Sequence, residues 1–374
     1  MERDPLELLE EPLIALVADR LVSEAQAAAG APAALYVADL DGRSLRRVAG
    51  DDALPGELET AQLVGPEIPA PQGAALVRAI PGAAVLPLTL RGRALSVLVF
   101  SAPPARDLAA LAARGAAALE LAERYTDVLA SRRRHRACSA AAELQQDLLP
   151  PRIARMEGAE VAGSILPAYD VGGDWIDHCA MAVGGWLGVA DAVGKGPQAS
   201  AIGAIALGAY RATRRGGGEL VDAAEHIHAA ICALEANEVF MSTVLGAWDG
   251  RSSSLTWLRC GHPPPMIWHP RRGLRALDGG DGPVLGLERL DPPREPARAT
   301  IAGDELVVLV SDGVLERAAP GGAPFGEDGL RRALDAMTAP SATAAVSAVL
   351  QAVATVHDGP LRDDASVLVL APVS

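Results

Sequence analysis

The sequence predicts a chain of mixed α and β structure, folded as two domains or three small ones. Its 374 residues exceed the roughly 100–200 residues that are typical of one domain. In the second half, short apolar runs typical of strands alternate with turns and with Ala-rich helical stretches. Half of the residues are hydrophobic but only 3% are aromatic, so we expect a core built from Ala, Val and Leu.

Charge and cysteine content exclude several classes of protein. The formal net charge of −14 argues against nucleic acid or an anionic membrane as partner, because phosphate groups require clustered Lys and Arg. The chain has no run of 18 apolar residues and opens without a signal segment. The four cysteines are far apart and form no CxxC pair, which argues against a zinc site. We therefore expect a cytoplasmic protein with free thiols.

Residues 1–104 are expected to form a small α/β domain. A helical pattern over residues 12–29 stops at Gly30. Turn signals at Asp41–Gly42 and at Arg91–Gly92 lie between apolar runs and predict two hairpins. The stretch between these hairpins, residues 55–81, is rich in Pro and Gly and has little periodicity.

Residues 105–150 are expected to form a helical linker. Apolar and small residues recur at 3–4 spacing from Leu108 to Leu129, which is about three heptads. Two alternatives stay open: a coiled coil that joins two copies of the chain through 105–149, or a helix packed on its own domain. A second short helix, residues 139–149, is expected to end at Pro150.

Residues 151–374 are expected to form a mixed α/β domain. Its strand-like runs fall at residues 186–190, 244–248, 255–258, 306–310 and 366–370. Its helical stretches fall at residues 197–213, 219–236, 327–337 and 341–356.

Aspartates stand at the edges of the strand-like runs in this domain. Six of them fall in four short segments: Asp174, Asp177, Asp191, Asp312, Asp363 and Asp364. One Asp at a strand end is usually a turn former, but clustered carboxylates repel one another unless a hard cation neutralises them. Mg²⁺ and Mn²⁺ prefer such oxygen ligands, and two ions about 3.5–4 Å apart lower the pKa of a shared water. The segments therefore favour a metal-dependent attack at phosphorus over a simple set of turns.

Seven short motifs in this domain carry a resemblance to a known family. In chain order they are LQQDLLPP (144–151), VGGDWID (171–177), DAVGKG (191–196), CGHPPP (260–265), GPVLGL (282–287), SDGV (311–314) and DDAS (363–366). Together they resemble the SpoIIE/RsbU-type branch of the metal-dependent protein serine/threonine phosphatases, the PPM family. The resemblance implies two packed antiparallel sheets flanked by helices, an αββα sandwich, within an overall α+β fold.

The resemblance also implies a site with two Mn²⁺ or Mg²⁺ ions. Asp191 matches the bridging aspartate and Ala192 would supply a backbone carbonyl. Asp312 and Asp363 match the other ligands, and Asp364 is the next candidate if the alignment shifts by one. The implied acidic neighbours and flanking glycines are Asp174, Asp177, Gly172 and Gly173.

Some positions depart from the family pattern. A Gly is usual at Ala190, a Val-Ser pair is usual at Ala192–Val193, and an aromatic is usual at Ile176. None of these changes removes a carboxylate, but a lost hydroxyl at Val193 can weaken support of the metal ligands.

Three cationic or imidazole side chains near the motifs have two interpretations each. Lys195 either pairs with substrate phosphate or is a solvated residue at a helix start. His262 either protonates the leaving oxygen or is structural, and the sequence favours the structural role. Arg362 is expected to pair locally with Asp363 and Asp364 rather than with phosphate.

The front domain resembles a GAF-type sensory domain, on the hairpin at residues 86–98. Residues 1–130 contain neither Cys nor His, which argues against bound haem and against a thiol-linked chromophore in this domain. Two roles stay open for the domain: binding of a small-molecule signal, or dimerisation.

The resemblance implies a phosphatase that acts on phosphoserine or phosphothreonine of an anti-sigma-factor antagonist, a STAS-type protein, within a partner-switching pathway. Two alternatives stay open. The chain is a weakly active or inactive relative that binds a partner protein, or it hydrolyses a small phosphorylated molecule.

Overall fold

The computed structural model describes residues 8, 11–60, 68–69, 82–167, 169, 172–234, 239–287, 294–359 and 361–373. The chain divides into two compact units, Met1–Ala137 and Cys138–Ser374. The expected linker, residues 105–150, is therefore shared between both units. The expected irregular stretch at residues 55–81 lies largely outside the described residues.

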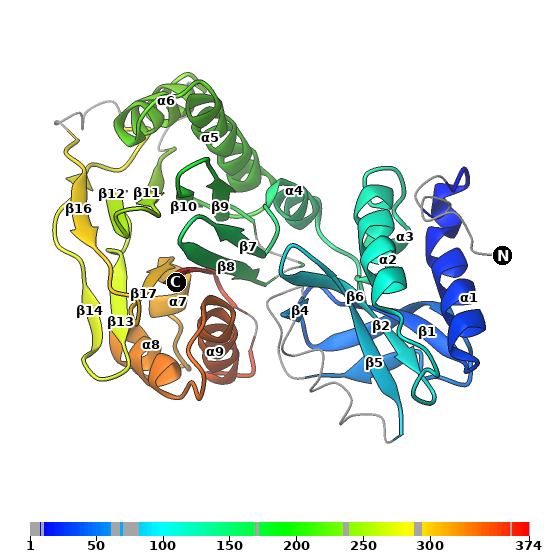
Figure 1. Ribbon diagram of the computed structural model, residues 1–374. Coiled ribbons are helices and arrows are strands. Elements are labelled where there is room, and N and C mark those ends of the chain that lie inside the picture. Colours follow the sequence, from blue (N-terminus) through cyan, green and yellow to red (C-terminus); the bar gives the residue numbers. More distant parts are fainter. Residues whose placement is uncertain are drawn as a thin grey trace. The chain divides into compact units, whose positions relative to one another are not determined.

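The first unit is a six-stranded sheet with helices packed against it (Figure 1). Its strands are β1 (Ala33–Ala38), β2 (Ser44–Gly50), β3 (Glu57–Glu59), β4 (Ile68–Pro69), β5 (Ala84–Leu90) and β6 (Arg93–Phe100). They run in the order β3-β2-β1-β6-β4, and β5 pairs with β6. Both expected hairpins form, β1–β2 and β5–β6.

Helix α1 (Val17–Ala29) follows a short 3-10 turn, Ile14–Leu16, and ends where the sequence indicates. Gly30 adopts a left-handed φ of 68° as its C-cap, a conformation that glycine adopts without steric cost.

The apolar face of the predicted long helix is buried within the first unit. The segment forms two helices, α2 (Ala109–Ala122) and α3 (Val128–Arg132), instead of one continuous helix. Leu111 and Leu119 of α2 lie in the same hydrophobic cluster as Leu21 of α1 and Leu98 of β6. Of the two open alternatives, the structure shows the helix packed on its own domain. A homodimer through 105–149 stays a prediction.

The second unit contains two six-stranded sheets. One has the order β15-β12-β11-β10-β9, with β16 paired to β12, and the other has the order β14-β13-β17-β18-β8-β7. The strands of the first are β9 (Trp175–Ala180), β10 (Gly185–Ala192), β11 (Met241–Asp249), β12 (Ser254–Cys260), β15 (Asp281–Gly282) and β16 (Ala297–Thr300). Those of the second are β7 (Ile153–Met156), β8 (Ala159–Leu166), β13 (Met266–His269), β14 (Gly273–Ala276), β17 (Leu306–Val310) and β18 (Ala365–Pro372). All pairs are antiparallel within these described strands except β12 with β15.

Helices cover the outer face of each sheet, as Figure 1 shows. Helices α5 (Pro197–Arg215) and α6 (Leu220–Cys232) pack on β10, β11 and β12, and α4 (Ala140–Leu148) packs on α5. On the other sheet, α9 (Ala342–Thr355) packs on β8 and β18, beside α8 (Gly326–Asp335) and the short α7 (Asp312–Leu315). This is the expected αββα sandwich.

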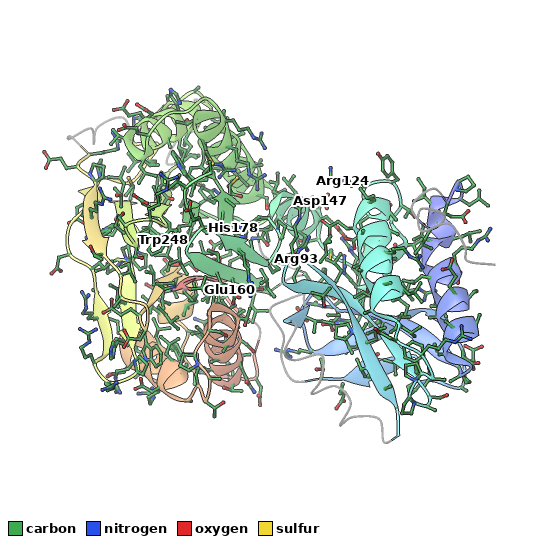
Figure 2. All side chains as sticks on the ribbon, viewed as in Figure 1. Arg93, Arg124, Asp147, Glu160, His178 and Trp248 are labelled. Atoms are coloured by element: carbon green, nitrogen blue, oxygen red, sulfur yellow. The ribbon has the colours of Figure 1, made fainter. Side chains whose placement is uncertain are left out.

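The main core of the second unit lies between the two sheets. Ile176, Val189, Val307 and Leu368 project into it from different strands and are at most 2% exposed. At one end of the unit, β11 of the first sheet is joined to the turn between β7 and β8 of the second sheet. The Trp248 indole of β11 donates a hydrogen bond to the Glu157 carbonyl of that turn at 3.0 Å (Figure 2). A second cluster, which includes Trp175 and Tyr210, lies under α5 and α6.

No helix in the described ranges is both long enough and apolar enough to cross a membrane.

Truncation of a side chain between the sheets should destabilise the second unit. Val307 is 0% exposed whereas Val373 is 46% exposed. We expect Val307→Ala to lower the free energy of unfolding by about 2 kcal/mol, and Val373→Ala to change it by less than about 0.5 kcal/mol. Urea unfolding followed by tryptophan fluorescence measures this, because all 5 tryptophans lie in the second unit. Equal effects of both variants would contradict the assigned core.

Candidate metal centre

Polar residues extend the inter-sheet core at one end of the sandwich. Val189 on β10 and Leu368 on β18 lie in the core. Side chains two residues apart in a strand share a face, so Asp191 and Ser366 project in the same inward direction near the ends of their strands. The alternation that buries the core therefore also directs these polar groups toward one another.

Asp191 is at the centre of a group of contacting carboxyl groups. The side chains of Asp174 and Asp312 lie close enough to shift its pKa, and Asp363 adds a further negative charge. Burial, followed by repulsion from Asp312, raises the pKa of Asp191 to about 7. Carboxyl groups in such contact share protons unless a cation replaces them.

Asp364 and Asp174 are the buried members of this group. Asp364 is 2% exposed, and burial raises its pKa to about 7. Gln145 of α4 donates to its Oδ2 at 2.8 Å, while its Oδ1 is buried without a hydrogen-bond partner among the described residues. Burial, with added repulsion from Asp191, holds the pKa of Asp174 well above its usual value. The Ser366 hydroxyl donates to Asp174.

Two glycines allow backbone to approach the carboxyl groups closely. A Cβ at Gly313 would lie 1.9 Å from the Asp364 carbonyl oxygen, so only glycine lets the first turn of α7 carry Asp312 against this segment. A Cβ at Gly173 would lie 3.2 Å from the Ala192 carbonyl oxygen. Gly173 thus keeps the space beside that carbonyl open. Gly172 packs instead against Ser200 and Ala141.

Three of the predicted ligands line one cleft of about 540 Å³. Asp191, Asp312 and Asp363 come from three separate segments and meet there. The remaining lining residues are Ala192, Val193, Gly194, Lys195, Phe240, Ser242, Gly261, His262, Pro263 and Val284.

The donor set fits hard divalent cations. It offers carboxylates that repel one another, a buried carboxylate oxygen without a partner on Asp364, and the carbonyl of Ala192. Within the described ranges, no three His, Cys, Asp or Glu side chains are already arranged as a cation site. Cations would replace the protons that the carboxyl groups share.

Asp177 does not join this group, contrary to the expectation that it lies beside the metals. It is 1% exposed and its two oxygens accept from Arg211 and Arg214, each at 2.7 Å. The physical reason is again alternation: Asp177 shares the face of Trp175, which lies in the cluster under α5. Asp177 therefore ties β9 to α5, and we leave it out of the proposed ligands.

Lys195 and His262 both line the cleft. The Lys195 ammonium lies 3.4 Å from an Asp363 oxygen and its side chain is 52% exposed. His262 is 3% exposed, its Nδ1 lies 2.7 Å from the Ser242 hydroxyl, and burial lowers its pKa to about 3. A neutral imidazole of this kind is a poor proton donor, which favours a structural role.

Sequence reasoning missed Gln145, Ser242, Ser311 and Ser366 as parts of the site. The Ser311 hydroxyl donates to the Asp364 carbonyl and accepts from the Ser366 amide, and so joins β17 to β18. Each of the three serines lies near a strand end, two positions from an apolar residue of the inter-sheet core, and that spacing is the signal that could have identified them. Ser311 and Ser366 also lie within two of the quoted motifs. Gln145 lies within a quoted motif, but its partners are distant in sequence.

Comparison with known proteins places the second unit in a family. The family model described as Stage II sporulation protein E (SpoIIE) matches residues 184–372, about half of the chain. No curated protein matches this chain.

Two solved structures share the fold. The SiaA-PP2C domain of Pseudomonas aeruginosa is 19% identical, with a TM-score of 0.52 over 62% of this chain and 93% of that one. The PP2C phosphatase domain and a fragment of the regulatory domain of SpoIIE from Bacillus subtilis are 15% identical, with a TM-score of 0.50 over 58% of this chain and 65% of that one.

Variants at Asp191 and Asp177 should separate cation binding from structural support. We expect Asp191→Asn to lower Mn²⁺ affinity at least about tenfold. Asp177→Asn should leave Mn²⁺ affinity near that of the unaltered chain but lower the free energy of unfolding by about 2–4 kcal/mol, because the buried Arg214 and the half-buried Arg211 lose their anion. Calorimetric Mn²⁺ titration and urea unfolding measure the two effects. Loss of Mn²⁺ binding in folded Asp177→Asn would contradict the assignment.

Without cations, the second unit should become less stable as pH rises. The folded-state pKa values of Asp191 and Asp364 are about 7, against about 3.9 in an unfolded chain. Between these values the folded state binds more protons than the unfolded state, so the free energy of unfolding falls with rising pH. We expect this fall in urea unfolding with EDTA between about pH 4 and 7, and a smaller one with Mn²⁺.

His262 and His178, whose pKa values burial lowers, act in the opposite sense over this range. The unaltered chain is therefore compared with Asp191→Asn, in which the fall should be smaller. A fall of equal size in both would contradict the carboxyl cluster.

Proposed function

The chain belongs to the SpoIIE family of metal-dependent protein phosphatases, and we propose that it removes phosphate from phosphoserine or phosphothreonine of a partner protein. The observation that carries this proposal is the convergence of Asp191, Asp312 and Asp363 in one open cleft. These residues come from β10, α7 and the loop before β18, so only the folded sandwich brings them together.

We propose that Asp191, Asp312, Asp363 and the Ala192 carbonyl hold two Mn²⁺ or Mg²⁺ ions, with Asp174 and Asp364 beside them. When bound, the cations supply a water of lowered pKa and neutralise charge on the phosphate. The chain itself positions the groups around the proposed cations. Ser366 orients Asp174, Gln145 orients Asp364, and Gly173 keeps the Ala192 carbonyl accessible.

Lys195 and His262 have different proposed roles toward the substrate. Lys195 is the cation of the cleft lining, and its exposed ammonium is able to move from Asp363 to a substrate phosphate. His262 stays neutral and holds Ser242 at the cleft wall. We assign no general acid to the chain.

The departures from the family pattern leave the cleft largely unchanged, which favours an active enzyme over an inactive binding protein. Ala190 and Ala192 are at most 1% exposed and their side chains lie in the cluster under α5 and α6, away from the carboxyl groups. Two of the departures, Ala192 and Val193, line the cleft; Ala192 faces the cluster under α5 and α6 with its side chain, so Val193 is the one whose lost hydroxyl bears on the cleft.

Helix α4 supplies a route for control of the site within the second unit. Gln145 of α4 is 4% exposed and donates both to the Asp174 carbonyl, at 3.0 Å, and to Asp364. A displacement of α4 would therefore remove support from two carboxyl segments together. We propose that residues 1–104, as a GAF-like sensor of a small-molecule signal, act through the segment 105–149.

The proposed substrate is a phosphorylated STAS-type anti-sigma-factor antagonist in the cytoplasm. This proposal rests on the family resemblance of the seven motifs and on the open, carboxylate-lined cleft.

Phosphate release from a phosphoserine STAS protein tests the function. With Mn²⁺, we expect release by the unaltered chain and a loss of at least about 10²-fold in Asp191→Asn and in Asp312→Asn, because each removes a proposed ligand. Arg251→Gln, on the β11–β12 hairpin and 73% exposed, is the control. Comparison with residues 138–374 shows whether the first unit alters the rate. Undiminished activity in both aspartate variants would refute the metal-dependent mechanism.

A further inference from the structure

A second pocket borders the carboxylate cleft. It has a volume of about 740 Å³ and shares Asp312 and Asp363 with the cleft. The proposed mechanism uses none of its other residues. This volume is within the range of ligand-binding pockets and far exceeds the space that one phosphate group needs. A substrate whose phosphate lies in the cleft would therefore have room to extend into this pocket.

The two walls of the pocket are tied to each other. One wall is the loop after α7, from Arg317 to Gly322, and the other includes His357, Gly359 and Leu361. Arg317 is 8% exposed and donates to the carbonyls of His357 and Gly359, at 2.7 Å each. Backbone bonds from Phe325 to Arg317, at 2.7 Å, and from Gly322 to Ala319, at 2.9 Å, hold the loop itself. The pocket is thus formed before any ligand binds.

Arg362 places an available positive charge on this pocket. The expected local pairing of Arg362 is not seen: Asp363 pairs with Lys195, and Asp364 accepts from Gln145. Arg362 is exposed, and within the described ranges its guanidinium has no ion pair or hydrogen bond. It lines this pocket and not the carboxylate cleft, whereas Lys195 lines the cleft and not this pocket.

The remaining surface suits a polypeptide. Ala318, Ala319 and Leu361 offer apolar contact, and the loops add polar backbone. The lining also holds the exposed carboxylate of Glu316, so contact with an anionic group is confined to the guanidinium of Arg362. Because Lys195 is the cation nearer the phosphate position, Arg362 is left for a second anionic group of the substrate. A carboxylate matches its planar donor geometry.

We propose that this pocket binds the polypeptide segment next to the phosphorylated residue, and that Arg362 pairs with a carboxylate side chain of that segment. The inference rests on the proposed function and adds a preference for acidic residues close to the phosphorylated serine or threonine.

Three substrates given to the full chain with Mn²⁺ test the inference. Two are phosphoserine peptides that differ only in flanking residues, Glu in one and Lys in the other, and the third is p-nitrophenyl phosphate. We expect kcat/KM to be about three- to tenfold higher for the Glu peptide, mainly through KM, as for a charge-assisted contact at a partly exposed site. Arg362→Glu should reverse this preference, and Arg362→Lys should largely retain it.

A second variant tests the pocket without changing its charge. Ala319→Trp places a large side chain in the pocket, away from the proposed ligands, and should lower kcat/KM for both peptides more than for p-nitrophenyl phosphate. Arg251→Glu, outside both cavities, should change none of the three values.

Each result separates the two hypotheses. Turnover of p-nitrophenyl phosphate without discrimination between the peptides would overturn the docking inference and leave the proposed function standing. Equal losses on all three substrates in Arg362→Glu and Ala319→Trp would also overturn it. No turnover of any substrate by the unaltered chain would overturn the proposed function, and the inference with it.

Discussion

Repulsion among carboxyl groups at one end of the sandwich is the constraint on which the site depends. The same alternation that buries Val189 and Leu368 between the sheets directs Asp191 and Ser366 to the end of that core. Burial limits the solvation of Asp191, Asp174 and Asp364 by water, so bound protons or cations must neutralise their charge. The raised pKa values of Asp191 and Asp364, both about 7, are the consequence in the cation-free chain. The folded chain thus retains repulsion among these carboxyl groups, and bound cations would reduce that repulsion.

Two buried acids three residues apart show how surroundings decide the role of a carboxylate. Asp177 receives two arginines and acts as a structural tie between β9 and α5. Asp174 receives a serine hydroxyl and faces other carboxyl groups. Since a buried ion pair of this kind satisfies its own charge, Asp177 has no remaining need of a cation, whereas Asp174 does.

From local patterns the sequence predicted a mixed α/β domain with aspartates at its strand edges, and the resemblance of the seven motifs implied the αββα layers and the three converging aspartates. It could not separate Asp177 from Asp174, since that difference depends on Arg211 and Arg214, more than thirty residues away. It likewise could not show that Gln145 contacts Asp364, 219 residues later. The break between α2 and α3 was also missed, because apolar spacing continues across it. The misses at Asp177 and Gln145 concern tertiary contacts that no local pattern encodes. The GAF-like assignment of residues 1–104 stays a prediction, since the family match begins at residue 184.

The form of the two cavities bears on the remaining alternative, a small phosphorylated substrate. A nucleotide is usually held by stacking on aromatic rings, and Phe240 is the one Phe, Tyr or Trp lining either cavity among the described residues. A small ester would fill the cleft and leave the neighbouring pocket unused. That pocket is nevertheless preformed, because the buried Arg317 binds two carbonyls across it. Asp312 and Asp363 line both cavities. A substrate that extends from one cavity to the other must therefore pass these two proposed metal-binding residues. A chain that carries its phosphate on a side chain and continues in both directions meets this requirement, which favours a protein substrate.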